Sequence, residues 1–206
     1  GDVPAANGVT GTGFVSNESI EDLSGELTYS YNYEQFGNVG TYKITPSGVT
    51  SNNYEITFAD GTLTVNAKAI TVTADALSKT YGETDPALTY TAQGLVNGDE
   101  LTGELKRVAG ENVGSYAIEQ NTLTAGNNYS ITYTGANLTI NAKAITEADV
   151  ELNGILTYTG KEQTQPITVT EGITYEVTGN KATNVGSYEL TVKGTGNYTG
   201  EVKLNW

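Results

Sequence analysis

One short motif occurs three times along the chain at a nearly constant spacing, and this repetition constrains the fold more than any other feature. Each copy reads Asn-Val-Gly, then Ser or Thr, then Tyr, and the copies begin at Asn38, Asn112 and Asn184. A period of roughly 70–75 residues is typical of a tandem array, in which each repeat is one small structural unit. We therefore expect three successive modules and not one large domain.

Two further repeated segments set the module boundaries. The segment Asn-Ala-Lys-Ala-Ile-Thr occurs unchanged at 66–71 and 141–146, and Asn-Asn-Tyr occurs at 52–54 and 127–129. A weaker counterpart of the second segment, Gly-Asn-Tyr, stands at 196–198. These matches predict module 1 at 1–67, module 2 at 68–142 and module 3 at 143–206. The connecting segment carries no Gly, Pro or Ser run, so we expect short, semi-rigid junctions.

Module 1 is expected to be incomplete. Module 2 opens with a predicted strand at 69–74, followed by a stretch that ends in Asp85-Pro86. The first residues of the chain, Gly-Asp-Val-Pro, resemble only the end of that stretch. A module without its first strand would have an unpaired sheet edge.

Strands dominate the predicted secondary structure. Apolar residues alternate with Thr or charged residues in several stretches, which is typical of half-buried strands. In one such stretch the apolar face is formed by Ile70, Val72 and Ala74, and in another it contains Leu190 and Val192. Helix signals are confined to 17–23 and 97–101, where capping-type residues and acids predict one or two helical turns.

The fold class predicted from these patterns is mainly β. Each module has four to five strands and at most one short helix. A module of this size fits a single curled sheet with a small cap, of the β-grasp type. An immunoglobulin-like β-sandwich typically needs ~100 residues, which is more than one module has. The Gly-x-Tyr step nevertheless occurs in such sandwiches, so the sandwich stays open as an alternative.

Composition excludes several functions. The chain has 10 Lys plus Arg against 24 Asp plus Glu, and a formal net charge of −14 disfavours nucleic acid and anionic lipid as partners. It contains no Cys and no His, so the commonest general base and metal ligands are missing. No apolar run reaches membrane-spanning length. We expect no enzymatic activity, no catalytic residues, no cofactor and no metal.

Tyrosines at 29, 31 and 33 form the strongest candidate for a ligand-binding patch. Module 2 has Leu105 and Arg107 in that region, so the repeat does not impose these aromatics. Tyrosine is favoured at interfaces, although most tyrosines in alternating strands pack in the core.

Acidic clusters and lysines offer two further candidates. The clusters do not match a calcium-binding loop, and a solvated acidic face is the favoured interpretation; they consist of Asp99, Glu100 and Glu104, and of Glu18, Glu21 and Asp22. Lys79 or Lys106 could form a cross-link with an Asn side chain, which would lower the intact mass by one ammonia.

The residues of module 2 resemble a known family. The matching segments are Ala69–Ala74, Lys79–Gly82, Asp85–Tyr90, Gly94–Asp99, Asn112–Tyr116 and Asn127–Tyr129. Together they resemble the MBG domain, Tyr-Gly type, of large repetitive bacterial surface proteins and adhesins. The likeness extends to the later part of module 1.

Module 3 resembles a related repeat that is common in Gram-positive surface proteins. This likeness is carried by 158–161 and 196–200. Module 3 departs from module 2 because it lacks the Asp-Pro segment and the Gly-Leu-Val-Asn-Gly-Asp segment.

The resemblance implies a secreted protein displayed at the bacterial cell surface, where the modules act as a stalk or spacer of an adhesin. We expect this chain to be a monomer. The alternative is an adhesive module that binds mucin, matrix protein or glycan. The resemblance supplies no catalytic residues and does not say which residues would bind a ligand.

Overall fold

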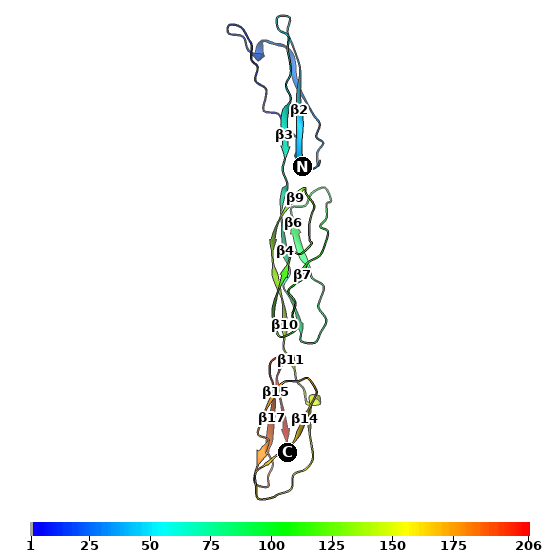
Figure 1. Cartoon of the computed structure of the whole chain (residues 1–206), viewed down its shortest axis with the longest axis vertical. Coiled ribbons are helices and arrows are strands. Elements are labelled where there is room, and N and C mark those ends of the chain that lie inside the picture. The colour runs from blue at the N-terminus through cyan, green and yellow to red at the C-terminus, as the bar shows by residue number, and fades with distance from the viewer. Residues whose placement is uncertain (1) are drawn as a thin grey trace. The chain divides into compact units, whose positions relative to one another are not determined.

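The computed structural model describes residues 2–206, and its regular secondary structure is almost entirely strands, numbered β1 to β19 (Figure 1). Within residues 2–206 the only helical elements are two 3-10 turns, η1 (Ile20–Asp22) and η2 (Glu147–Asp149). The mainly-β prediction is therefore confirmed.

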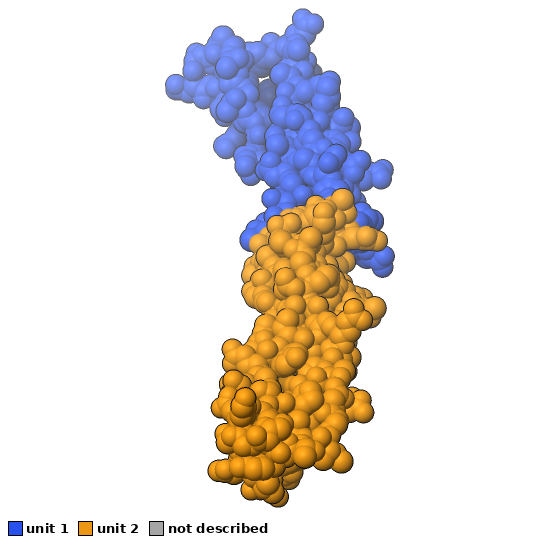
Figure 2. Space-filling view, turned by 60° about the horizontal axis from the view of Figure 1, so that its bottom comes forward, with its two compact units in different colours: residues 1–72, 92–103, 123–132 blue, residues 73–91, 104–122, 133–206 orange. Residues whose placement is uncertain are grey.

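The chain divides into two compact units (Figure 2). The first contains the residues up to 72 together with 92–103 and 123–132, and the second contains 73–91, 104–122 and 133–206. All five dividing lines, at 72/73, 91/92, 103/104, 122/123 and 132/133, fall inside predicted module 2, and three of its strands contain residues of both units. The boundaries at 67/68 and 142/143 follow the sequence repeat and stay a prediction.

Module 1 contains one antiparallel sheet with the order β1-β2-β3. Its strands are β1 (Ser24–Tyr31), β2 (Gly40–Thr50) and β3 (Gly61–Val65). The β1–β2 register shifts between Gly25 and Thr28. Gly25 and Gly48 have φ of 91° and 95°, and a Cβ on either would collide with a backbone carbonyl oxygen of the opposite strand. Glycine is therefore required on both strands at this irregularity.

Module 2 contains two sheets, ordered β6-β4-β9 and β5-β10-β8-β7. β10 pairs antiparallel with β8 and parallel with β5. The predicted inward face of β4 is confirmed, since Ile70, Val72 and Ala74 are 2%, 0% and 5% exposed. The strands are β4 (Lys68–Ala74), β5 (Leu77–Thr80), β6 (Tyr90–Gln93), β7 (Lys106–Arg107), β8 (Gly114–Glu119), β9 (Tyr129–Thr134) and β10 (Ala136–Asn141).

Module 3 is built from shorter strands. The three-stranded sheet is β15-β17-β19, and β12-β14, β11-β18 and β13-β16 form two-stranded sheets. The strands are β11 (Lys143–Ala144), β12 (Val150–Leu152), β13 (Gln163–Thr164), β14 (Ile167–Val169), β15 (Tyr175–Thr178), β16 (Lys181–Ala182), β17 (Glu189–Gly194), β18 (Tyr198–Thr199) and β19 (Glu201–Asn205).

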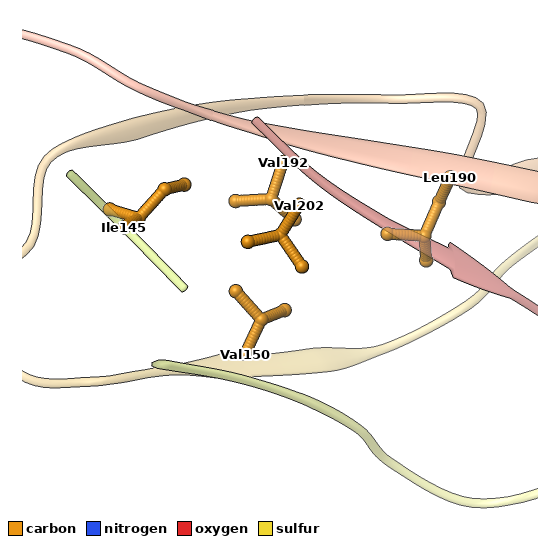
Figure 3. Close-up of a cluster of buried hydrophobic side chains, with 5 residues drawn as sticks. All are labelled: Ile145, Val150, Leu190, Val192 and Val202. Atoms are coloured by element: carbon orange, nitrogen blue, oxygen red, sulfur yellow. The ribbon is translucent and has the colours of Figure 1, made fainter. Parts of the chain in front are cut away.

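The core of module 3 lies between two layers of strands. Val150 on β12 points toward Val192 on β17 and Val202 on β19, with Ile145 and Leu190 at either side (Figure 3). Leu190 and Val192 are fully buried, as the alternation predicts. Strands thus occupy the place where a β-grasp would have its helix, which agrees with the sandwich alternative.

The two predicted helical segments have different outcomes. In 17–23 the turn η1 forms, and the Ser19 backbone N–H donates to Oδ2 of Asp22 at 2.7 Å as part of a capping box. At 97–101 the prediction is wrong. Asn97 and Gly98 have φ of 59° and 76°, and two left-handed residues make a tight turn that a right-handed helix cannot include.

Candidate functional site

The three Asn-Val-Gly turns share one internal hydrogen bond. In each, the tyrosine hydroxyl donates to the carbonyl oxygen of the asparagine four residues earlier, and this bond holds the turn closed. The pairs are Tyr42 and Asn38 at 2.7 Å, Tyr116 and Asn112 at 2.7 Å, and Tyr188 and Asn184 at 2.8 Å. The sequence repeat is thus also a repeat of geometry.

The first of these turns is bound by Asn128, and all residues involved belong to the first compact unit. The Val39 backbone N–H donates to Oδ1 of Asn128 at 2.9 Å, and Nδ2 of Asn128 donates to Oδ1 of Asn38 at 3.0 Å. The carbonyl oxygen of Asn128 accepts from the Lys68 N–H at 2.9 Å. We call this set of three hydrogen bonds the asparagine clamp.

A second clamp has the same bonds and lies within the second unit. Oδ1 of Asn197 accepts from the Val113 N–H at 2.8 Å, and its Nδ2 donates to Oδ1 of Asn112 at 2.9 Å. The carbonyl oxygen of Asn197 accepts from the Lys143 N–H at 3.0 Å. The weak Gly-Asn-Tyr counterpart in module 3 is therefore structurally equivalent to Asn-Asn-Tyr in module 2.

The chemistry of the clamp requires an asparagine. A carboxamide offers one acceptor and one donor side by side, which match a backbone N–H and the Oδ1 of a second asparagine. Aspartate has the acceptor but lacks the donor when ionised, and an aliphatic residue has neither. The repeated asparagines could be seen in the sequence, but their partners in the Asn-Val-Gly turns are 84 to 90 positions away. No local pattern therefore reveals the contact.

The tyrosine after the clamp asparagine also has a repeated role. The Tyr129 hydroxyl donates to Asp99 at 2.6 Å and accepts from the Val96 N–H at 3.2 Å. The hydrogen bond to Asp99 raises the pKa of Tyr129. One member of the predicted acidic cluster thus serves as a fixed acceptor.

Module 1 repeats this arrangement with its own residues. The Tyr54 hydroxyl donates to the Glu18 carboxylate and accepts from the Val15 N–H at 3.2 Å. The hydrogen bond to Glu18 raises the pKa of Tyr54. In module 3 the equivalent Tyr198 contacts Tyr81 edge to face, with ring centroids 5.5 Å apart.

Four charged side chains form an ion network in module 2. Lys79 lies 2.7 Å from both Asp85 and Glu111, and Arg107 binds the same two carboxylates. The Lys79 and Arg107 side chains are only 4% and 10% exposed. Hydrogen bonds from Arg107 and Lys79 lower the pKa of Asp85 to about 2.

This network bears on the suggested lysine cross-link. The groups at hydrogen-bonding distance from Nζ of Lys79 are the carboxylates of Asp85 and Glu111 and the carbonyl oxygen of Glu83. The pKa of Lys79 is raised by its bonds to Asp85 and then Glu111, so its amine stays protonated. A protonated amine is not a nucleophile, and the arrangement is that of an ion network.

The three tyrosines of the predicted patch do not act together. Tyr33 is buried at 8% exposure and packs edge to face on Tyr42, with ring centroids 5.0 Å apart. Tyr29 and Tyr31 are half-buried on β1. Of the three, only Tyr29 lines a groove, and Tyr33 is part of the core of module 1.

That groove lies in module 1 and has a volume of about 1000 Å³. It runs between the sheet, the segment 5–14 and the segment 54–60. Its apolar lining includes Phe14, Tyr29, Ile44, Tyr54, Ile56 and Phe58. Of these residues, only Tyr29 belongs to the patch that was predicted from the sequence.

A smaller pocket of about 330 Å³ lies in module 3 beside the third Asn-Val-Gly turn. Three of its lining residues are well-exposed apolar side chains: Ile155 at 97%, Tyr158 at 62% and Val185 at 84%. Tyr188 and Trp206, whose ring centroids lie 5.1 Å apart, complete its aromatic wall.

The described part of the chain has neither a cluster of metal-ligating side chains nor a membrane-spanning helix. No group of three or more Asp or Glu side chains within residues 2–206 is arranged to hold a metal ion. In the same residues no helix has the length and apolarity needed to cross a membrane.

Repeated turns, repeated clamps and small sheets define a tandem β-repeat protein. The family model described as MBG domain (YGX type) matches residues 1–64 and 70–139, which together are more than half of the chain. The chain belongs to this family. Module 3 lies outside the matched segments, in line with its looser resemblance. Neither the comparison with curated proteins nor that with solved structures gives a match.

Proposed function

We propose that this chain is a non-enzymatic repeat region of a secreted bacterial surface protein, in which the modules act as a stalk or spacer. The observation that carries the proposal is the pair of asparagine clamps, which close two successive junctions with the same hydrogen bonds. Membership of the MBG family supports a repeat region of a surface protein.

Each junction is held at two points. The covalent connection is short, since β3 ends at Val65 and β4 begins at Lys68, and β10 ends at Asn141 and β11 begins at Lys143. The clamp forms the second attachment. A segment joined at two separate points resists bending more than one joined by a linker alone.

The clamps are individually weak. A hydrogen bond contributes about 0.5–1.5 kcal/mol net, so a clamp of three adds a few kcal/mol at most. This is enough to hold a junction closed for most of the time, because the short connection keeps the two partners close together. A spacer needs this property and needs no ligand site.

Small-angle scattering of the whole chain tests the spacer. We expect a particle whose maximum dimension approaches the sum of three modules. The double variant Asn128→Ala with Asn197→Ala should broaden the distribution of dimensions, while Asn137→Ala, an exposed asparagine on β10, should not. A compact wild-type particle with module 3 folded back on module 1 would refute the proposal.

The groove of module 1 favours a second candidate function, that of an adhesive module for mucin, matrix protein or glycan. Aromatic walls stack on sugar rings and pack against extended peptides. Four aromatic residues line the groove: Phe14, Tyr29, Tyr54 and Phe58. A volume of about 1000 Å³ is at the upper end of ordinary ligand sites.

Binding to a panel of mucin, matrix proteins and glycans at physiological salt tests this second function. Tyr29→Ala should abolish a saturable signal, whereas Tyr31→Ala is the matched control because Tyr31 is half-buried on the same strand but does not line the groove. Equal loss in both variants, or no saturable signal in the wild type, would contradict binding in the groove.

A further inference from the structure

We call an Asn-Val-Gly turn a socket where it binds a clamp asparagine, as the turns at Asn38 and Asn112 do. We propose that the Asn184-Val185-Gly186 turn of module 3 is a third socket, and that it binds the Asn-Tyr turn of a further module of the same family. The inference rests on the proposed function, because it names the partner through which the spacer is extended. Its experiment separates the failure of this socket from the failure of the two clamps.

The third turn is already shaped for the clamp. The Tyr188 hydroxyl donates to the Asn184 carbonyl oxygen at 2.8 Å, compared with 2.7 Å at each of the two bound turns. The backbone pairing of the tyrosine is also alike, although the strand starts later. Tyr42 lies inside β2 and pairs with Leu63, whereas Tyr188 lies just before β17 and exchanges two backbone hydrogen bonds with Trp206. Binding would therefore require no rearrangement of the turn.

Exposure of the central valine separates the bound turns from the third. Val39 and Val113, whose N–H groups are held by a clamp asparagine, are 39% and 40% exposed. Val185 is 84% exposed, about twice as much. Within residues 2–206 its N–H has no hydrogen-bond partner. The two bound valines thus show how much of Val185 an incoming turn would cover.

An aromatic contact extends the likeness. At the second clamp the incoming Tyr198 packs edge to face on Tyr81, which follows Thr80 and precedes Gly82. In module 3 Tyr158 stands in the corresponding Thr-Tyr-Thr-Gly segment and is 62% exposed. The pocket of about 330 Å³ that it lines adjoins Val185. An incoming tyrosine would pack there against Tyr158.

The chemistry of the socket selects the partner. It offers one backbone donor and one asparagine side chain in the arrangement that a carboxamide fills at the other two turns. An Asn-Tyr turn supplies both the carboxamide and the aromatic ring.

The partner must belong to the same chain. Three hydrogen bonds and one ring contact do not offset the translational and rotational freedom that two separate proteins lose on association. Attachment through a short connection removes most of that cost, because it raises the effective concentration of the turn. The occupant is therefore a module joined after Trp206, as module 3 is joined after Asn141.

The experiment adds such a module. Trp206 pairs with Tyr188 as Leu63 pairs with Tyr42, so a copy of residues 64–142 appended after Trp206 continues the strand in register. Amide hydrogen exchange of the valine N–H groups is then followed by NMR in the extended and the original chain. We expect exchange at Val185 to slow by about tenfold or more in the extended chain.

Variants of the appended copy identify the cause. Asn128→Ala in that copy should return Val185 to its original exchange rate, whereas Asn127→Ala, an exposed neighbour in the same turn, should leave it slow. If the appended module does not fold, a copy of residues 139–206 with its clamp residue Asn197 takes its place. Unchanged exchange at Val185 next to a folded appended module would overturn the proposal.

Val39 and Val113 provide the internal standard. In the original chain their N–H groups should exchange slowly and should speed up with Asn128→Ala and Asn197→Ala respectively. Fast exchange at both valines in the original chain would refute the clamps and with them the spacer. Slow exchange at both, with Val185 unaffected by the appended module, would refute the third socket alone.

Discussion

Modules 1 and 2 carry nearly the same sequence in one segment and fold it differently. In module 2 the alternating residues Tyr129, Ile131 and Tyr133 belong to strand β9. The corresponding Tyr54 and its neighbours up to 60 are outside any strand. β9 has β4 beside it in the sheet β6-β4-β9, whereas module 1 has no counterpart of β4 in its described residues. An alternating pattern thus forms a strand only where a partner strand is present.

The missing partner also changes the core. Phe58 in module 1 is 40% exposed, whereas the equivalent Tyr133 is half-buried and donates its hydroxyl to the Ile118 carbonyl oxygen at 2.9 Å. The largest fully buried side chains, such as Leu138 and Leu190, all lie in modules 2 and 3. Module 1 therefore has less buried apolar surface to stabilise it.

Hydrogen exchange should give the largest difference between the two segments. Amides of residues 54–60 should exchange almost freely, because backbone groups outside a sheet open at little cost. Exchange should be slowed by about 1000-fold or more at the β9 amides that are hydrogen-bonded within the sheet, because these bonds break only when the whole module unfolds. The measurement is amide exchange by NMR or mass spectrometry. Similar protection of both segments would mean that module 1 has found a partner strand in solution.

Core truncation should distinguish the modules next. Leu138 on β10 and Leu63 on β3 are equivalent, since each pairs with the tyrosine of the Asn-Val-Gly turn. Leu138 is fully buried and Leu63 is half-buried. Leu138→Ala should lower the free energy of unfolding by about 2–5 kcal/mol, and Leu63→Ala by less than half as much. Denaturant unfolding monitored by tyrosine fluorescence measures both; equal losses would show that module 1 is packed as densely as module 2.

Acid should weaken module 2 through its ion network. The pKa of Asp85 is about 2 in the folded chain, below its ordinary value of 3.8. A lowered pKa contributes stability that is complete above about pH 4 and is lost as the pH falls toward 2. The Glu111 pKa is lowered in the same direction by Lys79 and Arg107.

The matched variant for this effect is Asp85→Asn. It should melt a few degrees below the wild type at neutral pH, and the difference should shrink as the pH approaches 2. Thermal melting followed by circular dichroism across this range provides the measurement. A constant difference at all pH values would mean that Asp85 stabilises the module by packing and not by its charge.

The sequence predicted much of this fold because its repeats are strong. The mainly-β class and the inward face at Ile70, Val72 and Ala74 followed from periodicity. The MBG family followed from the resemblance of the repeated motifs to a known family. The helical turns at 97–101 failed because a capping pattern does not report φ, and Asn97 with Gly98 takes the left-handed region.

The candidate sites were harder to predict for a physical reason. The clamp asparagines and the turns that they bind are far apart in sequence, and Val113 and Asn197 are separated by 84 positions. Sequence alone placed Tyr29, Tyr31 and Tyr33 in one patch, but Tyr33 lies beyond the end of β1 and packs in the core against Tyr42. Repetition in the sequence indicates which residues have a structural role, whereas contacts across a sheet or a junction are visible only in the three-dimensional structure.

The smallest effect is expected at the ion pair between Lys43 and Asp60 in module 1. Nζ of Lys43 lies 2.7 Å from Asp60, and hydrogen bonds from Lys43 and then Thr45 lower the pKa of Asp60. The Lys43 side chain is 68% exposed, so water and salt screen the pair.

We therefore expect Lys43→Ala to leave the unfolding midpoint unchanged within error, and added salt to have no effect on the difference. Arg107→Ala is the contrasting variant, because Arg107 is 10% exposed and also donates to the carbonyl oxygens of Val108 and Gly110. Removal of the Arg107 side chain leaves these two carbonyl oxygens and the carboxylates of Asp85 and Glu111 with fewer hydrogen-bond donors. The unfolding midpoint should therefore fall clearly. If Lys43→Ala lowered the unfolding midpoint as much as Arg107→Ala, the part of module 1 beside the groove would be more ordered than expected for a segment without a partner strand. The contrast between the two modules would then be lost.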